Sequence, residues 1–397
     1  MRRFNPKHLT LARLIDPLLG ILALGWRRFG ASPPGADAEV WRIIVFEFFF
    51  LGDLIMATPA LRALRRRFSR AEIVLLAPTA AVGLKRNLPW IDRLVTFDCP
   101  WSAHRYDPRT LWQAVRVVRR LRRERWDLAI ELRGDLRNIC LAALIGARRR
   151  AGFATTGGSR LLTDIVPYDD SLLKHQLEGN LEVVRHLGCD VSENLPELAQ
   201  QENDDLAAER EFRVLSMPVI GVHPSAGRDN RLWESAKWAQ LVDRLVAEFE
   251  ASIVILHGPS QRDRELAREI YDRTGRKERC RLLSPSLTNL VALVRRLDLL
   301  IALDSAPSHI AAATATPFVS LFGPQTPDLT RPYHFSGRVV VKDGFPCRPC
   351  GIRCAYGIDN RCMKAITVED VLGAARDLLA RPETCSTQEE RHERCAG

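Results

Sequence analysis

Several common signatures of cofactor and nucleic-acid binding are missing from this chain of 397 residues. It has neither a GxGxxG fingerprint nor a Walker loop, which disfavours a dinucleotide-dependent dehydrogenase and a P-loop NTPase. It also has no helix-turn-helix, zinc-finger or RNA-recognition signature, so nucleic acid is not an expected partner. With 46% hydrophobic and 27% charged residues, the composition is that of a folded globular protein. The length predicts two domains.

The N-terminal part also lacks an apolar run of transmembrane length. Residues 9–26 are its most apolar stretch, but Arg13, Asp16 and Pro17 interrupt them. A spanning helix needs about 20 predominantly apolar residues, so we do not expect one here.

A cleaved signal peptide is not expected either. Residues 36–38 have the small-x-small form of a cleavage site, but Arg27 and Arg28 directly follow the apolar run. We expect residues 1–39 to contain an interfacial helix and a linker, with basic ends that touch an anionic leaflet. A helix that packs on the body of the protein, or a segment without structure, is the alternative. Residues 381–397 read as a polar tail.

The ten cysteines do not form the pattern of a disulfide scaffold. Six of them occur singly, which favours a reducing compartment. These six are Cys99, Cys140, Cys189, Cys280, Cys385 and Cys395. The other four are Cys347, Cys350, Cys354 and Cys362, in a Cys-rich segment that extends with a C-terminal helix over residues 346–380. Four thiols suffice for a structural zinc ion, and reduced thiols or an occasional disulfide are the alternative.

The formal net charge of +10 favours an anionic partner. A phosphorylated sugar, an acidic membrane surface and nucleic acid all meet that description, so the charge does not choose among them. The arginine runs at residues 65–67, 119–123 and 148–150 read as solvated helix faces.

From Val40 onward, apolar strands alternate with basic helical segments, which is typical of parallel sheets covered on both faces. Strands are predicted at residues 41–46, 72–76, 94–97, 127–132, 219–223, 252–257, 299–303 and 318–322, and helices at 111–125, 237–250, 262–272 and 287–296. We expect an α/β protein with an N-terminal Rossmann-like domain over residues 40–205 and a C-terminal one over 206–345, facing a central cleft. Ligands in such folds bind at the carboxyl ends of the strands.

Three loops after predicted strands contain residues capable of chemistry, and the first contains Gly52 and Asp53. Gly52 allows a positive φ and the close approach of another molecule. Asp53 has two interpretations. It caps a single helical turn, near Thr58 and Pro59, or it is a general base that accepts the proton of an attacking hydroxyl.

The second loop follows the strand at residues 219–223 and suits a diphosphate. Ser225 and Gly227 open the backbone, and the guanidinium groups of Arg228 and Arg231 bind phosphate oxygens. A loop with surface arginines is the alternative.

The third loop leads from a strand into a helix whose N-terminal amides form an anion site. Ser305 is the expected cap and Pro307 lies near the first helical position. Asp304 would accept hydrogen bonds from sugar hydroxyls. His309 is either a packed helix residue or a ligand contact.

Taken together, these loops resemble the heptosyltransferases of glycosyltransferase family 9, which attach heptose to the inner core of lipopolysaccharide. The resemblance runs from about Val40 to Leu379 and rests on five motifs in the family's order. The motifs are FFFLGDLIMATPALRAL, RLWESAKWAQL, LDSAPSHIAAA, FGPQTP, and CRPCGIRCAYGIDNRCM followed by ITVEDVL.

The resemblance implies a GT-B fold, with the acceptor in the N-terminal half and a nucleotide-sugar, ADP-heptose, in the C-terminal half. It implies inversion at the anomeric carbon without a metal or another cofactor. Asp53 would be the base on the acceptor hydroxyl, and Gly52 would lie in the acceptor-side loop.

On the donor side, the resemblance implies that Arg231 binds the diphosphate, with Ser225 and Arg228 beside it, and that Asp304 holds sugar hydroxyls. The phosphates and the sugar would be lined by Ser305, Ala306 and His309. Two of these positions depart from the family, which has a lysine at Arg231 and a glycine at Ala306. Asp263 is the nearest match to the family's acidic residue at the donor ribose.

Two alternatives stay open. One is a transferase of the same fold that uses another nucleotide-sugar in surface polysaccharide synthesis, and the other is a non-catalytic nucleotide- or glycolipid-binding protein. The expected partners are a nucleotide-sugar donor, a glycolipid acceptor and an anionic membrane surface. The expected location is the cytoplasm, peripheral on the inner face of the inner membrane.

Overall fold

The computed structural model describes residues 39–103, 106–169, 174–201, 208–350, 354 and 359–380. The interfacial helix expected before residue 39 and the polar tail expected after residue 380 lie outside these residues. Within the described part of the chain, no helix is both long and apolar enough to cross a membrane.

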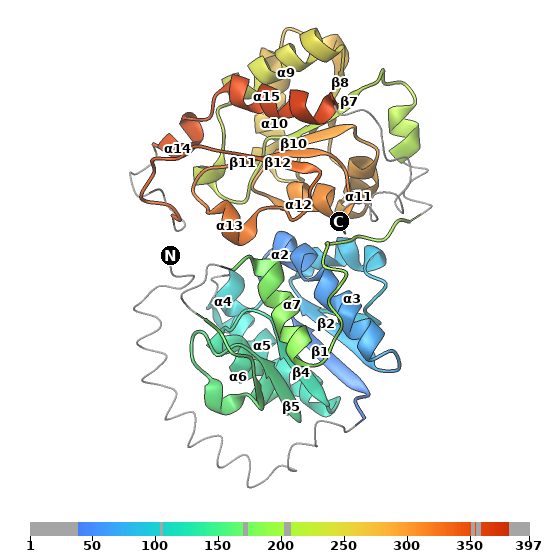
Figure 1. Cartoon of the computed structure of the whole chain (residues 1–397), viewed down its shortest axis with the longest axis vertical. Helices are drawn as coiled ribbons and strands as arrows, with labels where there is room; N and C mark the ends of the chain where they lie inside the picture. Colours follow the sequence, from blue (N-terminus) through green and yellow to red (C-terminus); the bar gives the residue numbers. More distant parts are fainter. Residues whose placement is uncertain are drawn as a thin grey trace. The chain divides into compact units, whose positions relative to one another are not determined.

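The chain divides into two compact units, each built on a six-stranded parallel sheet (Figure 1). The first unit comprises residues 1–201 and 328–333, and the second comprises 202–327 and 334–397. The short return of residues 328–333 to the first unit was not expected from the sequence. It has a polar basis, because Tyr333 Oη donates a 2.5 Å hydrogen bond to Glu178 and the carbonyl of Arg331 lies 2.9 Å from His175 Nε2.

The first sheet has the strand order β3-β2-β1-β4-β5-β6. The elements of this unit are β1 (Arg42–Phe46), α2 (Leu51–Met56), α3 (Thr58–Arg67), β2 (Glu72–Ala77), η1 (Thr79–Asn87), β3 (Arg93–Thr96), α4 (Pro100–Ala103), α5 (Pro108–Arg123), β4 (Leu128–Glu131), α6 (Leu136–Leu144), β5 (Arg149–Gly152), η2 (Ser159–Leu161), β6 (Asp164–Ile165) and α7 (Gln176–His186). The order reverses between β1 and β4, which is the topological switch point where open α/β sheets bind ligands.

The second sheet has the order β12-β11-β10-β7-β8-β9, with its switch point between β7 and β10. Its strands are β7 (Val219–His223), β8 (Ser252–Leu256), β9 (Cys280–Leu283), β10 (Leu299–Leu303), β11 (Phe318–Phe322) and β12 (Gly337–Val341). Its helices are η3 (Asp229–Arg231), α9 (Ser235–Phe249), α10 (Gln261–Arg273), η4 (Lys277–Arg279), α11 (Leu287–Arg295), α12 (Ala306–Ala313), α14 (Arg361–Lys364) and α15 (Val368–Leu379). Helix α13 (Pro327–Thr330) lies where the chain returns to the first unit.

The expected α/β class, with two Rossmann-like sheets, is confirmed. Strands β1, β7, β8, β10 and β11 are buried along almost their whole length, which is why they read as continuous apolar runs. Four shorter or more peripheral strands, β5, β6, β9 and β12, were missed. Two of the four residues of β5 are arginines, and β6 has only two residues, so no apolar run marks either strand.

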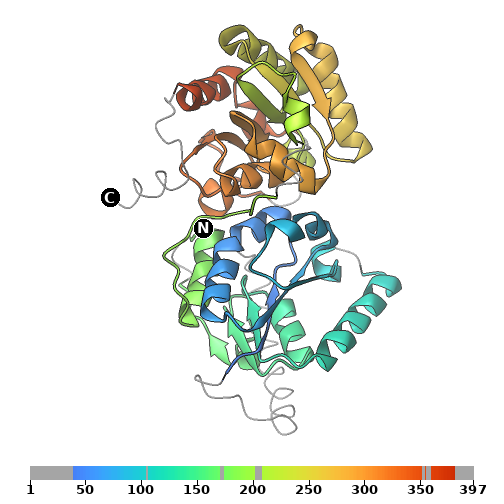
Figure 2. The ribbon, with the colours of Figure 1, turned by 90° about the vertical axis from the view of Figure 1, so that its right-hand side faces the viewer.

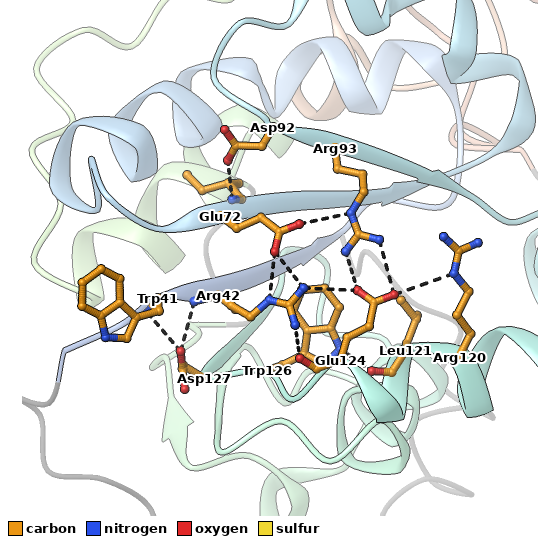
Figure 3. A network of polar contacts seen from close by, with 11 residues as sticks. Trp41, Arg42, Glu72, Asp92, Arg93, Arg120, Leu121, Glu124, Trp126 and Asp127 are labelled. Atoms are coloured by element: carbon orange, nitrogen blue, oxygen red, sulfur yellow. Dashed lines mark hydrogen bonds and ion pairs between the residues drawn. The ribbon is translucent and has the colours of Figure 1, made fainter.

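A network of ion pairs between arginines and glutamates links the amino-terminal ends of the strands of the first sheet (Figure 3). Glu72 accepts from Arg42 Nε at 2.8 Å and from Arg93 Nε at 3.2 Å. Glu124, which follows α5, pairs with Arg93, and its Oε2 lies 3.6 Å from Arg42 Nη2. Burial opposes ionisation of Glu124, but the hydrogen bond and charge of Arg93 outweigh it and lower the pKa of this carboxyl. The network joins β1, β2, β3 and the end of α5.

Candidate active site

The carboxyl edge of the first sheet places Asp53 at the switch point between β1 and β4. Asp53 lies in the first turn of α2, with 7% of its surface exposed. Its Oδ2 is 2.5 Å from Nη1 of Arg133, a residue that follows β4. Its Oδ1 accepts no hydrogen bond from the described residues. One oxygen is therefore oriented by a cation, and the other is available to an incoming hydroxyl.

The capping interpretation of Asp53 is wrong. Phe50 is the N-cap of α2 and Ala57 is the N-cap of α3, and neither helix receives a side-chain cap. Thr58 is the first residue of α3, and its Oγ1 donates to the carbonyl of Ile55 at 2.7 Å. The side chain of Asp53 instead forms a long-range ion pair.

The expectation for Gly52 is also corrected. This glycine is the second residue of α2, not part of a loop, and it is not among the glycines with positive φ. The glycine of this edge that needs its special conformation is Gly134, with a φ of 76°. A Cβ added there would lie 1.7 Å from Thr155 Oγ1.

Two further carboxyl groups lie buried beside Asp53 and Arg133. Glu47 follows β1 and is fully buried, and its Oε1 is 3.8 Å from Arg133 Nη1. Its Oε2 is buried without a hydrogen-bond partner among the described residues. Glu131 ends β4, where it accepts from the amides of Arg133 and Gly134 and from Asn138 Nδ2. Asp53 and Glu47 thus share the guanidinium of Arg133, while Glu131 binds its backbone amide.

The electrostatics of this group follow from its burial. Burial raises the pKa of Glu47 to about 8 against the attraction of Arg133, and burial raises the pKa of Glu131 to about 7. Burial by itself would lower the pKa of Arg133, but the charges of Asp53 and Glu47 outweigh it and raise that pKa. The guanidinium carbon of Arg133 also lies 4.1 Å from the ring centroid of Phe49, a cation–π contact. Arg133 is therefore a permanent cation held in one place.

The carboxyl edge of the second sheet brings Arg231 and Asp304 together. Arg231 ends η3, and its Nη1 donates to the backbone carbonyl of Asp304 at 2.9 Å and lies 3.1 Å from Asp304 Oδ2. The side chains are 20% and 7% exposed. Nε of Arg231 is buried with no hydrogen-bond partner in the described residues. Asp304 thus holds the guanidinium group of Arg231 through Nη1, and Nε remains a donor for a ligand.

Other polar atoms at this edge are buried without a described partner. Ser225 is 3% exposed and its Oγ has none, and the same holds for Nδ1 of His223 at the end of β7. Burial lowers the pKa of His223 to about 4, so its ring is neutral at physiological pH. Unsatisfied polar atoms that collect in one place are a mark of a ligand site.

The start of α12 differs from the expected cap in one detail. Ser305 is the N-cap residue, but its Oγ donates to the carbonyl of Leu303 at 3.2 Å instead of accepting from the helix amides. Ala306 is the first helical residue and is half-buried, and Pro307 follows it. His309 is buried inside the helix. The first-turn amides therefore receive no side-chain cap.

Arg228 and Asp263 lie around the same strand ends. Burial lowers the pKa of Arg228, and the neighbouring charge of Arg231 acts in the same direction. Asp263 lies in the first turn of α10, where its charge opposes the lowered pKa of His223. A Cβ on Gly258 would lie 2.6 Å from Asp263 Oδ2. The donor-side candidates from three strand ends thus belong to one edge of the second sheet.

The cysteine cluster shows no metal site within the described residues. Within the described residues, no disulfide joins any of the four cysteines, Cys347, Cys350, Cys354 and Cys362. No three His, Cys, Asp or Glu side chains in the described ranges are grouped as metal ligands would be. The zinc alternative therefore has no geometric support in this part of the chain.

Comparison with known proteins identifies the family. A family model described as glycosyltransferase family 9 (heptosyltransferase) matches residues 114–355, more than half of the chain. The chain belongs to this family. The transferase is 26% identical over 313 residues to lipopolysaccharide heptosyltransferase 2 of Escherichia coli K12, a match that covers 75% of this chain and 87% of the relative.

Solved structures agree with the fold of this family 9 transferase. One is the E. coli ADP-heptose lps heptosyltransferase II, with a TM-score of 0.69, 23% identity and coverage of 86% of this chain and 100% of that one. Another is E. coli heptosyltransferase WaaC with ADP-2-deoxy-2-fluoro heptose, with a TM-score of 0.61, 14% identity and coverage of 85% and 99%.

Sequence reasoning missed Arg133, Glu47 and Glu131 in this transferase. Each lies at or just after the carboxyl end of a buried strand. Glu47 follows β1, Glu131 is the last residue of β4, and Arg133 comes two residues later. That position was the available signal, because ligands in open α/β sheets bind at these ends. The pairing of Arg133 with Asp53 was not available, since 80 residues separate them.

Proposed function

We propose that this family 9 transferase moves heptose from a nucleotide-heptose, ADP-heptose, to a lipopolysaccharide-core or related glycolipid acceptor. The reaction inverts the anomeric carbon and needs no metal ion. The observation that carries the proposal is the family match together with Asp53, whose carboxylate is held by Arg133 at the switch point of the first sheet. The names of the relatives support the donor and the acceptor, since they include an ADP-heptose lipopolysaccharide heptosyltransferase.

In this mechanism Asp53 is the general base. Arg133 fixes Oδ2, which directs Oδ1 toward the acceptor hydroxyl, and the proton moves from that hydroxyl to the carboxylate as the oxygen attacks the anomeric carbon. A carboxylate on a packed helix is more precisely placed than one on a flexible loop. The single attack displaces the nucleoside diphosphate from the opposite face, which gives inversion.

The second unit binds the donor. Arg231 and Arg228 supply positive charge for the diphosphate, and the uncapped amides of α12 supply hydrogen-bond donors. These groups stabilise the negative charge that develops on the leaving diphosphate, so a cation is not required. Ser225 and the buried Nε of Arg231 are donors that await an acceptor.

The carboxylate of Asp304 has two tasks in this scheme. It holds Arg231 in place through an ion pair, with Arg231 Nη1 3.1 Å from Asp304 Oδ2. It also accepts hydrogen bonds from the hydroxyls of the donor sugar. Ser305, Ala306 and His309 line the phosphates and the sugar, and Asp263 binds the ribose. The methyl group of Ala306 narrows the approach to the first turn of α12.

Binding and transfer distinguish this proposal from its alternatives. The protein is heated with ADP, ADP-heptose or UDP-glucose, and we expect only the adenine nucleotides to raise its melting temperature. Arg231→Ala should remove most of that rise, whereas Asp53→Asn should keep it. Incubation with ADP-heptose and a heptose-deficient lipopolysaccharide should add one heptose, detected by mass.

Three outcomes decide among the possibilities. A shift with UDP-glucose but not with ADP-heptose would contradict the donor and favour another surface polysaccharide transferase. Binding of ADP-heptose without transfer to any glycolipid would favour a non-catalytic binding protein. Transfer that is abolished by chelation and restored by a divalent cation would contradict metal independence.

The proposed location is the cytoplasmic face of the inner membrane, where a glycolipid acceptor is accessible to a peripheral enzyme. The basic net charge supports contact with anionic lipid.

A further inference from the structure

Helix α5 of the first unit presents an unusual surface to solvent. Its sequence PRTLWQAVRVVRRLRR contains six arginines and no acidic residue, and Leu121 is its one fully buried side chain among those described. Asp107 caps its start by accepting from the amides of Arg109 and Thr110. Figure 2 shows the helix on the outside of the unit.

The core-facing side of α5 is accounted for. Ala114, Val117 and Val118 pack with Leu121 against the hydrophobic core of the first unit. These positions recur at intervals of three and four, so they form one stripe of the helix. The helix needs no other apolar residue to dock on its own sheet.

A second set of apolar side chains borders that stripe and is exposed. Leu111 is 47% exposed, Trp112 59% and Val115 45%, and together we call them the α5 apolar patch. Val115 follows Leu111 by four residues and Trp112 by three, so it neighbours both on the helix surface. Large exposed apolar side chains that cluster in this way mark an interaction surface more than scattered ones do.

Arginines border the α5 apolar patch. The guanidinium carbon of Arg116 lies 4.5 Å from the centroid of the Trp112 ring. Arg119 and Arg123 form no ion pair with other described residues and are exposed. Arg122 donates to the carbonyl of Leu144, an exposed leucine at the end of α6.

We propose that α5 is a membrane-docking helix that inserts its apolar patch into the interface of an anionic lipid bilayer while its arginines bind the lipid phosphates. Tryptophan and leucine on one face with arginines around them are the composition of helices that lie in a membrane interface. Charge of a single sign matches a uniformly anionic leaflet better than the mixed charges of a protein partner. The membrane contact itself does not depend on the proposed function. Only its biological purpose does, which is to bring the enzyme to a glycolipid acceptor.

The experiment is flotation of the full chain with vesicles of phosphatidylcholine and phosphatidylglycerol in equal parts, compared with phosphatidylcholine alone. No donor or acceptor is present, so the result is independent of whether transfer occurs. Serine at all three patch positions (Leu111→Ser, Trp112→Ser, Val115→Ser) should lower the partition coefficient by about tenfold or more. The changed side chains are exposed, so the melting temperature should stay near that of the unmodified protein.

A charge variant and its matched control complete the test. Replacing Arg116, Arg119 and Arg123 with glutamine should weaken binding to the anionic vesicles by about fivefold for each arginine. The control removes three charges from exposed arginines of α10, as Arg264→Gln, Arg268→Gln and Arg273→Gln. This variant should bind the anionic vesicles almost as well as the unmodified protein.

Three results would overturn the proposal. Binding that survives the patch variant but is lost on removal of residues 1–38 would assign the membrane contact to that segment. Equal losses in the α5 and α10 charge variants would show attraction by net charge alone. A patch variant that changes the oligomeric state without changing vesicle binding would assign the patch to a second copy of the chain.

Discussion

The two edges of the first sheet both combine acidic residues with arginine, but in opposite ways. At the amino edge, Glu72 and Glu124 meet Arg42 and Arg93 in a matched set at half-buried positions. At the carboxyl edge, the buried carboxyl groups of Asp53 and Glu47 share Arg133, and one oxygen of Glu47 has no partner in the described residues. The first arrangement satisfies its own charges, whereas the second keeps charge and hydrogen-bonding capacity unused. Charged groups with unused hydrogen-bonding capacity at a switch point are typical of a ligand-binding or catalytic site. Charges that are matched within the protein, as at the amino edge, stabilise the fold instead.

The largest expected effect separates the edges by activity. Asp53→Asn removes the proposed base and should lower the transfer rate by about 10²–10⁴-fold. Asp127→Asn makes the same chemical change at the amino edge, where Asp127 accepts from the amides of Trp41 and Arg42 at 3.0 Å. Rates are measured by heptose transfer at saturating donor. Equal losses in both variants would contradict a special role for the carboxyl edge.

The second effect separates the edges by stability. Arg133→Gln leaves buried carboxyl groups without their cation and should cost about 3–5 kcal/mol in the free energy of unfolding. Arg93→Gln removes a partly exposed cation from a network and should cost about 1 kcal/mol or less. Denaturant unfolding measures both. A cost for Arg93→Gln as large as that for Arg133→Gln would remove the distinction.

The third effect is a pH dependence at the carboxyl edge. The folded protein raises the pKa of Glu47 from 4.5 to about 8, so between these values the folded state binds more protons than the unfolded state. Stability should therefore fall as pH rises from about 5 to 8, by at most about 1.4 kcal/mol per pH unit for one proton. Glu47→Gln should reduce this slope, which is measured by unfolding at several pH values. An unchanged slope would exclude Glu47 as its source.

The smallest effect has the opposite sign and belongs to the amino edge. The pKa of Glu124 is lowered because Arg93 outweighs the cost of burial. Its stabilisation is therefore present above pH 4.5 and is lost as pH falls through the lowered pKa. Glu124→Gln should cost about 0.2–1 kcal/mol at neutral pH and progressively less in acid. A cost that grows in acid would contradict this sign.

The central strands of both sheets could be predicted because their own residues carry the signal. The spans 219–223, 299–303 and 318–322 were predicted at their observed bounds, since they are mostly apolar and buried throughout. Strand β5 was missed because Arg149 and Arg150 occupy half of it. Arg149 is accommodated by an ion pair to Asp164 on the neighbouring strand, at 2.5 Å, which a local pattern does not contain.

The candidate site divides in the same way. Asp53 and Arg231 stand in motifs and could be found by local sequence, but their partners could not. Gly52 lies in helix α2 and has no positive φ. The glycine with a positive φ at this edge is Gly134, which follows a different strand.

The sequence by itself determined the α/β class, the family and the residues that a family 9 motif contains. Tertiary structure decided which charges meet. Pairing of β1 with β4 places Phe46 beside Glu131, and this register brings the residues that follow the two strands to one edge. Arg133 reaches Asp53 only through that pairing, because a buried ion pair between distant residues depends on the position of the backbone and not on either residue's neighbours in sequence.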